Sequence, residues 1–285
     1  MPPELPPAVQ QLVSLALAED IGDGDVTARY FVPPGSRSLG RIVAREPGIA
    51  AGTEVATAVF LQIDPTVTVK VLTPDGAAFT QGGVLLEVEG PSASLLTAER
   101  TALNFLQRLS AIATQTHRYV EAIKPHPVKL LDTRKTAPGW RLLEKAAVKA
   151  GGGASYRIGL YDQVMVKDNH LLADDRLEDL QAAIDKVKAD RPGILVELEA
   201  DTLAQVRGFL TLRGVDVILL DNMKTSLLRE AVAMNAGRVQ LEASGGVTVE
   251  TIGSIAATGV NAISVGALTH TVRALDLSLE FVPAE

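Results

Sequence analysis

The second half of the chain alternates between short apolar segments and helical segments, and this regular alternation constrains the fold more than any other feature. Six apolar segments lie between Val128 and Ala267, and a helical pattern follows each of the first five. Strands that alternate with helices form βαβ units, which place successive strands parallel in one sheet. The expected strands are residues 128–133, 164–168, 194–200, 215–222, 239–245 and 262–267.

Polar and charged residues stand where these strands stop, in the strings LLDT, VKD, ELEA, LLDN and LEASGG. A β/α barrel carries its active site on the carboxyl ends of strands arranged in a ring. A doubly wound sheet instead collects its ligand at one crevice. Because nearly every strand end carries a charge, we predict an incomplete β/α (TIM-like) barrel rather than a doubly wound sheet.

Single residues mark the ends of the expected helices. A helix end leaves backbone groups without intrahelical partners, and particular residues satisfy them. Thr202 and Thr248 are expected N-caps, because a threonine hydroxyl accepts from the first turn. The expected left-handed C-caps are Gly151, Gly214, Gly237 and Gly259.

The first part of the chain lacks this alternation. We expect a helix over residues 8–19, a Gly/Asp-rich loop over 19–27 and a long helix over 94–123. Strand patterns at 41–52, 66–72 and 83–90 surround a short helix at 55–62. This mixture predicts a smaller α+β domain, residues 1–110. The barrel domain follows as residues 111–285, with its last residues free to return to the first domain.

Composition places the chain among ordinary globular proteins, with 47% hydrophobic and 21% charged residues. It has no cysteine, which excludes disulfides, thiolate metal sites and cysteine nucleophiles. The longest apolar runs are short and interrupted, so no membrane span is expected. The start of the sequence has no basic segment and soon turns acidic, unlike a secretory signal, and we therefore expect a soluble cytoplasmic protein.

Charge is distributed unevenly along the chain. The net charge of −7 argues against a nucleic-acid binder. Between Arg100 and His170, however, 12 Lys and Arg residues face only 5 Asp and Glu residues. This cationic region predicts a site for a polyanionic small molecule, and a merely basic helix surface is the alternative.

Three cations follow expected barrel strands. Arg134 and Lys135 lie in DTRKTAPG, where Arg can clasp a carboxylate or phosphate in a fork and Lys adds a point charge. Lys167 lies near the C-terminal end of the apolar segment VMVKD. The alternatives are a solvated basic loop for the first two, and for Lys167 an edge residue that extends into solvent.

Carboxylates form a second group at the same strand ends. Glu197 and Glu199 are two residues apart in one strand and so face the same side. Asp221 ends the next strand. Such carboxylates can hold Mg²⁺ shared with substrate phosphates, or stabilise a cationic transition state. A structural salt-bridged core is the alternative.

Glycines form a third group. Ser244, Gly245 and Gly246 precede a helix, and Gly266 follows the sixth strand. Backbone N–H groups in such turns bind phosphate, often at the late strands of a barrel. An ordinary turn is the alternative reading.

Several long strings of this chain resemble the quinolinate phosphoribosyltransferase family, also called nicotinate-nucleotide pyrophosphorylase (carboxylating). They are AEDIGDGDVT, ERTALNFLQRLSAIAT, DTRKTAPGWRLLEKAAVKAGGG, YRIGLYDQVMVKDNH, VELE, LLDN, LEASGG and GVNAISVGALTHTV. The resemblance covers essentially the whole chain in the right order. It implies an N-terminal open α/β sandwich, a C-terminal incomplete β/α barrel, and a dimer or larger homo-oligomer.

The resemblance also implies the chemistry. This family of pentosyltransferases converts quinolinate and phosphoribosyl pyrophosphate, with Mg²⁺, to nicotinate mononucleotide, pyrophosphate and CO₂ for de novo NAD synthesis. By motif, Arg100 from the neighbouring subunit would bind the quinolinate carboxylates together with Thr133, Arg134, Tyr156, Arg157 and Lys167. Lys135, Glu199, Asp221, Ser244, Gly245, Gly246 and Gly266 would bind phosphoribosyl pyrophosphate. Lys135, Lys167, Glu199 and Asp221 would be catalytic, with Glu199 and Asp221 near the metal.

One position departs from the family. Tyr156 stands where the family commonly has His, and a phenol with a pKa of about 10 lacks the switchable charge of an imidazole. A proton-transfer role is therefore in doubt there.

Three other functions stay open. The first is a relative associated with molybdate transport that uses another acceptor. The second is an aldolase with Lys167 as its Schiff base, and the third is a non-catalytic sensor of phosphometabolites.

Overall fold

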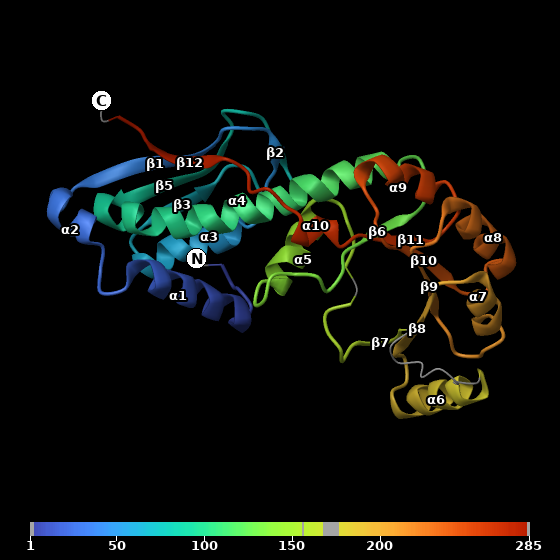
Figure 1. Ribbon diagram of the computed structural model, residues 1–285. Helices are drawn as coiled ribbons and strands as arrows, with labels where there is room; N and C mark the ends of the chain where they lie inside the picture. Colours follow the sequence, from blue (N-terminus) through green and yellow to red (C-terminus); the bar gives the residue numbers. More distant parts are fainter. Residues whose placement is uncertain (1–2, 156, 168–176, 284–285) are drawn as a thin grey trace. The chain divides into compact units, whose positions relative to one another are not determined.

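The computed structural model describes residues 3–155, 157–167 and 177–283 (Figure 1). These residues form two compact units, and each unit combines helices with a sheet. The first comprises Met1–His117, Thr136–Gly152 and Leu268–Glu285, and the second comprises Arg118–Lys135 and Gly153–Ala267. Each unit therefore takes its residues from more than one stretch of the chain.

The first unit contains a four-stranded antiparallel sheet in the order β12-β1-β5-β3. The last strand of the chain pairs with the first, from Gly40 opposite Phe281 to Ala44 opposite Leu277. The strands are β1 (Arg37–Ala44), β3 (Thr68–Val71), β5 (Val84–Pro91) and β12 (Leu277–Phe281), with a separate pair β2 (Gly48–Ile49) and β4 (Ala78–Phe79).

Helices α3 and α4 lie on one side of this sheet (Figure 1). Apolar side chains of these helices and of the sheet are buried. Phe60 of α3, Phe105 of α4 and Ile42 of β1 are almost completely buried. The helices of this part are α1 (Pro7–Ile21), α2 (Val26–Phe31), α3 (Thr53–Ile63), α4 (Ser92–Ile123), α5 (Arg141–Ala150) and α10 (Ala267–His270). The last residues of α4, from Arg118, belong to the second unit.

The second unit is built on a six-stranded sheet in the order β6-β11-β10-β9-β8-β7, and every neighbouring pair is parallel. Among the described residues no pairing joins β6 to β7, so this sheet is not a closed ring. The predicted incomplete β/α barrel is confirmed. The strands are β6 (Lys129–Leu131), β7 (Gln163–Val166), β8 (Leu195–Ala200), β9 (Val217–Asp221), β10 (Gln240–Ser244) and β11 (Ala262–Ser264).

Helices connect the strands along the outside of this sheet (Figure 1). Their inward side chains are buried, as Val206, Leu228 and Ile252 show. The helices are α6 (Leu177–Asp190), α7 (Leu203–Phe209), α8 (Thr225–Asn235) and α9 (Val249–Ala256). No helix within the described ranges has the length and apolar character needed to cross a membrane.

The two predicted N-caps are confirmed. Thr202 Oγ1 accepts the Gln205 N–H at 3.3 Å, while Gln205 Oε1 accepts the Thr202 N–H at 2.9 Å. At the start of α9 the Thr248 N–H donates to Thr251 Oγ1 at 2.9 Å. Both helices thus begin at the predicted threonine, whose backbone N–H donates to the side chain three residues later.

Three of the four glycines predicted as caps, Gly214, Gly237 and Gly259, have the expected positive φ angles. They lie beyond the actual C-caps of α7, α8 and α9, which are Leu210, Ala236 and Ala257. The prediction for Gly151 is wrong, because its φ is −75°. A Cβ at Gly151 would lie 2.3 Å from the Ala113 carbonyl oxygen, so the glycine is required by a close backbone approach and not by a left-handed conformation.

The predicted loop over residues 19–27 is also partly wrong. Helix α1 continues to Ile21, and α2 begins at Val26. Asp25 caps α2, with its Oδ1 accepting the Ala28 N–H at 2.8 Å. The Gly/Asp content marks the short turn between two helices and the cap of the second.

Candidate active site

The carboxyl ends of all six parallel strands lie along one edge of the second unit's sheet, because parallel strands end on the same side. The register places Ser264 of β11 beside Leu131 of β6, and Ser244 of β10 beside Asp221 of β9. The predicted site residues of this unit follow or end these strands. They are Thr133, Arg134 and Lys135 after β6, Lys167 after β7, Glu199 near the end of β8, Asp221 at the end of β9, Ser244–Gly246 after β10 and Gly266 after β11.

Lys167 and Glu199 form an ion pair at this edge. Lys167 Nζ lies 2.6 Å from Glu199 Oε2, because the pairing of Val166 with Leu198 brings the next residue of each strand together. The Glu199 side chain is 9% exposed, whereas the Lys167 side chain is 46% exposed. A nearly buried carboxylate is therefore neutralised by a cation that still reaches solvent.

Glu197 lies deeper on the same side of β8. It is completely buried, and its Oε2 accepts a hydrogen bond of 2.5 Å from Gln163 Nε2 on β7. Glu197 and Glu199 both contact residues of the β7 segment, as their spacing predicts. Glu197 belongs to the interior of the sheet, and Glu199 lies at its edge.

A tight turn orients Arg157. Its Nε donates to the Gly159 carbonyl at 3.2 Å, and its Nη1 lies 2.7 Å from Met165 Sδ on β7. Asp162 closes the turn by accepting the N–H groups of Ile158 and Gly159. Burial raises the pKa of Asp162, but these backbone hydrogen bonds and Arg157 outweigh it and leave the pKa below its usual value.

The segment after β6 begins with a local turn. Thr133 Oγ1 accepts the Lys135 N–H at 3.1 Å, which is typical of threonine in a turn. Lys135 is exposed and Arg134 is half-buried. A turned backbone thus carries two adjacent cations at the carboxyl edge of the sheet.

Asp221 and the glycine loop meet through Asn222. The side-chain amide of Asn222 donates to Asp221 Oδ2 at 2.6 Å, and its backbone N–H donates to the Ser244 carbonyl at 2.9 Å. Gly245 and Gly246 have φ angles of +97° and +58°, a region that glycine adopts without strain. This edge of the sheet therefore places the Asp221 carboxylate beside a glycine loop whose own backbone can be approached closely.

Two predicted residues lie apart from this description. Arg100 belongs to the first unit, where it is exposed on α4. Burial raises the pKa of its neighbour Glu99, which Arg100 partly offsets. Tyr156 lies outside the described residues.

The carboxylates at the sheet edge suit a metal ion that is coordinated mainly by the phosphates of a bound substrate. No group of three or more His, Cys, Asp or Glu residues in the described ranges is placed to hold a metal ion. Mg²⁺ commonly uses only one or two carboxylates together with substrate phosphates. The oxygen donors of Glu199 and Asp221 fit that mode of binding.

Sequence comparison accounts for both halves of the chain. The family described as "Quinolinate phosphoribosyl transferase, N-terminal domain" matches residues 25–110, and its C-terminal domain matches residues 112–280. The chain belongs to the quinolinate phosphoribosyl transferase family.

Individual members of this family are similar over most of their length. A tobacco (Nicotiana tabacum) protein named quinolinate phosphoribosyltransferase [decarboxylating] 1b is 41% identical, over 94% of this chain and 81% of its own. A Bacillus subtilis protein named probable nicotinate-nucleotide pyrophosphorylase [carboxylating] is 40% identical, over 95% of this chain and 93% of its own. The solved structure of the nicotinate-nucleotide pyrophosphorylase from Francisella tularensis has a TM-score of 0.91 and 38% identity, and 98% of each chain is covered.

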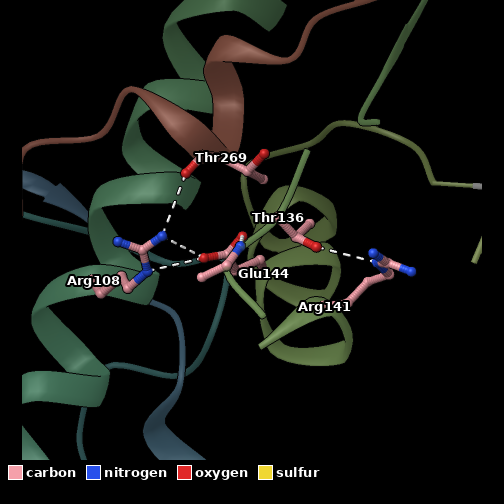
Figure 2. Close-up of polar contacts among 6 residues, drawn as sticks. Arg108, Thr136, Arg141, Glu144 and Thr269 are labelled. Atoms are coloured by element: carbon pink, nitrogen blue, oxygen red, sulfur yellow. Dashed lines mark hydrogen bonds and ion pairs between the residues drawn. The ribbon is translucent and has the colours of Figure 1, made fainter. Parts of the chain in front are cut away.

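Sequence analysis missed the anchor of the DTRKTAPG segment in this family member. The fully buried Glu144 of α5 accepts from Arg108 Nε at 2.9 Å and Nη2 at 2.5 Å (Figure 2). It also accepts from the Ala137 N–H at 3.2 Å. Arg141 Nε donates to Thr136 Oγ1 at 3.1 Å in the same cluster. Glu144 thus fixes the backbone just beyond the cations Arg134 and Lys135.

The sequence carries little sign of this anchor. Glu144 follows two leucines in RLLEK, which places it near the apolar face of α5, but its partner Arg108 is 36 residues earlier. Asn222 was missed as well, although its signal is local. An Asn directly after a strand is typical of a left-handed turn position.

Proposed function

We propose that the chain transfers the phosphoribosyl group of phosphoribosyl pyrophosphate to quinolinate with loss of CO₂, giving nicotinate mononucleotide and pyrophosphate. The observation that supports this most is the arrangement along one sheet edge of two cations after β6, the Lys167–Glu199 pair, and Asp221 beside a glycine loop. A dianionic acceptor needs the cations. An activated sugar phosphate needs the carboxylates and the loop.

The acceptor would be held by cations. Arg134 and Arg157, with Arg100 from a neighbouring subunit, would clasp the two quinolinate carboxylates in charged hydrogen bonds. Thr133, Tyr156 and Lys167 would border the same pocket. Because Lys167 contacts Glu199 at 2.6 Å, the acceptor would lie directly beside the carboxylate that faces the ribose.

The donor would be held by the opposite part of the edge. The backbone N–H groups of Ser244–Gly246, and Gly266, would bind the 5′-phosphate. Lys135 would neutralise the departing pyrophosphate. Mg²⁺, near Glu199 and Asp221, would add charge neutralisation on the pyrophosphate.

The reaction would need no covalent enzyme intermediate. The pyridine nitrogen attacks the anomeric carbon as the bond to pyrophosphate breaks, and Glu199 and Asp221 stabilise the positive charge that develops on the sugar. When the adjacent carboxylate leaves as CO₂, the electron pair of the broken bond stays on the ring carbon, where the positively charged ring nitrogen stabilises it, and a proton taken up from solvent at that carbon completes nicotinate mononucleotide. Orientation and preorganised charge supply most of the acceleration.

Two of the alternatives lose support. A Schiff-base lysine is activated by apolar or cationic surroundings, whereas Lys167 is bound to the Glu199 carboxylate. A sensor of phosphometabolites would not require the acceptor cations. A different acceptor is tested directly by a panel that includes nicotinate and quinolinate.

The decisive assay mixes the purified protein with quinolinate, phosphoribosyl pyrophosphate and Mg²⁺, and measures released CO₂ and pyrophosphate. Both products should appear in equal amounts and only when all components are present. Turnover of another acceptor without CO₂ would refute the proposal. Cell fractionation would test the expected cytoplasmic location.

Arg134→Ala tests the acceptor site. Loss of a charged hydrogen bond should weaken quinolinate binding by at least ~2 kcal/mol, seen as a raised KM for quinolinate. Arg229→Ala, on the exposed surface of α8, is the matched control and should behave like the wild type. Unchanged quinolinate kinetics in Arg134→Ala would remove this residue from the proposed site.

A further inference from the structure

Asn222 has a backbone conformation that few residues adopt. Its φ is +54°, and among the described residues other than glycine only Ala236 shares a positive φ. The left-handed region disfavours residues with a Cβ, and Asn is one of the residues that tolerate it best. Such conformations persist where the surrounding contacts hold them, and they are common at functional sites.

The contacts of Asn222 join two neighbouring strands at their carboxyl ends. Its backbone N–H continues the β9–β10 ladder by donating to the Ser244 carbonyl at 2.9 Å. The left-handed turn then brings its side chain back toward Asp221, whose Oδ2 accepts the amide at 2.6 Å. One residue therefore holds both the end of β10 and the carboxylate at the end of β9.

The same side chain lies against the glycine loop. A Cβ built on Gly245 would be 2.1 Å from Asn222 Oδ1 and 2.9 Å from the Asn222 nitrogen. Since such distances are far below van der Waals contact, only a glycine allows the loop to approach this closely. The amide of Asn222 thus lies between the Asp221 carboxylate and the Gly245 backbone.

We infer that Asn222 is a positioning residue that sets the Asp221 carboxylate at a fixed distance from the glycine loop. The inference rests on the proposed function, in which Asp221 serves the ribose and the loop serves the 5′-phosphate of one substrate. The ribose and phosphate of that substrate are linked covalently. Correct spacing of their two binding groups should therefore govern affinity for phosphoribosyl pyrophosphate and leave affinity for quinolinate unchanged.

Two substitutions separate this role from a merely structural one. Asn222→Gly keeps the left-handed backbone without strain but removes the amide. Asn222→Asp keeps the shape and the backbone tolerance but replaces the donor with a second carboxylate beside Asp221. If Asn222 only filled space, Asn222→Asp would be nearly neutral.

Calorimetric binding of phosphoribosyl pyrophosphate with Mg²⁺, in the absence of quinolinate, is the primary measurement. Asn222→Gly should weaken this binding roughly 10-fold, the loss expected for a hydrogen bond to a charged group. Asn222→Asp should weaken it further because like charges then face each other. In steady-state assays the KM for phosphoribosyl pyrophosphate should rise while the KM for quinolinate stays unchanged.

Ala236→Gly is the matched control, because it makes the same backbone change at the other positive φ and lies at the end of α8. It should leave binding unchanged. The decisive comparison repeats Asn222→Gly in an Asp221→Ala background, where its effect should largely disappear because it acts through Asp221. If the losses of binding caused by Asn222→Gly and Asp221→Ala were additive, the inference would be overturned. It would also be overturned if the Asn222→Asp variant bound phosphoribosyl pyrophosphate like the wild type.

Failure of the proposed function has a different signature. If the wild type binds phosphoribosyl pyrophosphate but does not turn over quinolinate, the acceptor assignment fails while the binding comparison still tests Asn222. If the wild type does not bind phosphoribosyl pyrophosphate at all, both the proposed function and the inference about Asn222 fail.

Discussion

Glu144 is a single buried charge around which several contacts between α4 and the start of α5 are arranged. Its carboxylate is fully buried and is neutralised by Arg108, whose side chain is 34% exposed. Arg108 also lies over the ring of Trp140, 5.8 Å from its centroid, and that ring stacks on Phe105 at 4.7 Å. Helices α4 and α5 are thus joined by one ion pair and one aromatic stack.

Arg108→Ala should destabilise the protein by ~3 kcal/mol, because it leaves the buried Glu144 charge without its main partner. Urea unfolding measures the loss. The control is Arg41→Ala, which removes an ion pair with Glu87 that lies at the surface and should cost less than ~1 kcal/mol.

A double variant, Arg108→Met with Glu144→Leu, removes both charges and should be markedly more stable than Arg108→Ala. Equal losses in the two variants would mean that packing of the arginine on Trp140, and not charge, accounts for the effect.

The sequence was enough to predict those candidate site residues that stand at the end of a strand. Arg134, Lys167, Glu199 and Asp221 each stand at or just after the end of an apolar segment, and parallel strands bring such ends together. The Arg108–Glu144 pair, which holds the backbone at Ala137, was harder to find. Arg108 and Glu144 are far apart in the sequence, and only the folded chain makes them neighbours.

At the scale of elements, the barrel strands and helices were predictable because each gives a local signal. Apolar runs of the right length and threonine caps agree along the second unit, and the predicted glycines lie one to four residues beyond the C-cap residues of its helices. The last residues were left free to return to the first domain, but strand β12 itself was not predicted, because its five residues carry only a weak pattern and its partner β1 lies more than 200 residues earlier. Helix α2 was missed because its signal is the single cap residue Asp25.

Strand β12 supports a further prediction. It covers the edge of β1, and its Leu277 side chain is buried. Its Leu279 side chain packs on Gly40, since a Cβ added to Gly40 would lie 2.9 Å from Leu279 Cδ1. Deleting residues 277–285 should destabilise the first unit by at least ~2 kcal/mol, since a buried Leu alone contributes about that much. An exposed strand edge should also promote aggregation.

Hydrogen exchange measures this loss at the amides of β1. Deleting only residues 283–285 is the control, because it keeps β12 and the hydrogen bond from the Val282 N–H to the Leu39 carbonyl. Unchanged protection of β1 in the longer deletion would show that β12 contributes nothing to the sheet.

The whole molecule is proposed to act as a homo-oligomer in which Arg100 of one chain serves the site of another. Mixing two inactive variants tests this. Arg100→Ala and Arg134→Ala chains, unfolded and refolded together in equal amounts, would form hybrids that contain one undamaged site. In a symmetric dimer the mixture should regain about a quarter of wild-type activity.

The result is informative in both directions. Activity that stays at the level of the two separate variants would mean that Arg100 acts within its own chain, or not at the site. Light scattering on the wild type supplies the number of chains in the assembly.

The first unit draws its residues from both ends of the chain, and this affects the order of events during synthesis. All six strands of the second unit's sheet have been translated once Ser264 is in place, so that sheet can form while the chain is still growing. Strand β1 pairs with Leu277–Phe281, which are translated only after all six of those strands. Although domains near the N-terminus usually complete folding first, in this protein the sheet begun earliest is the one finished latest.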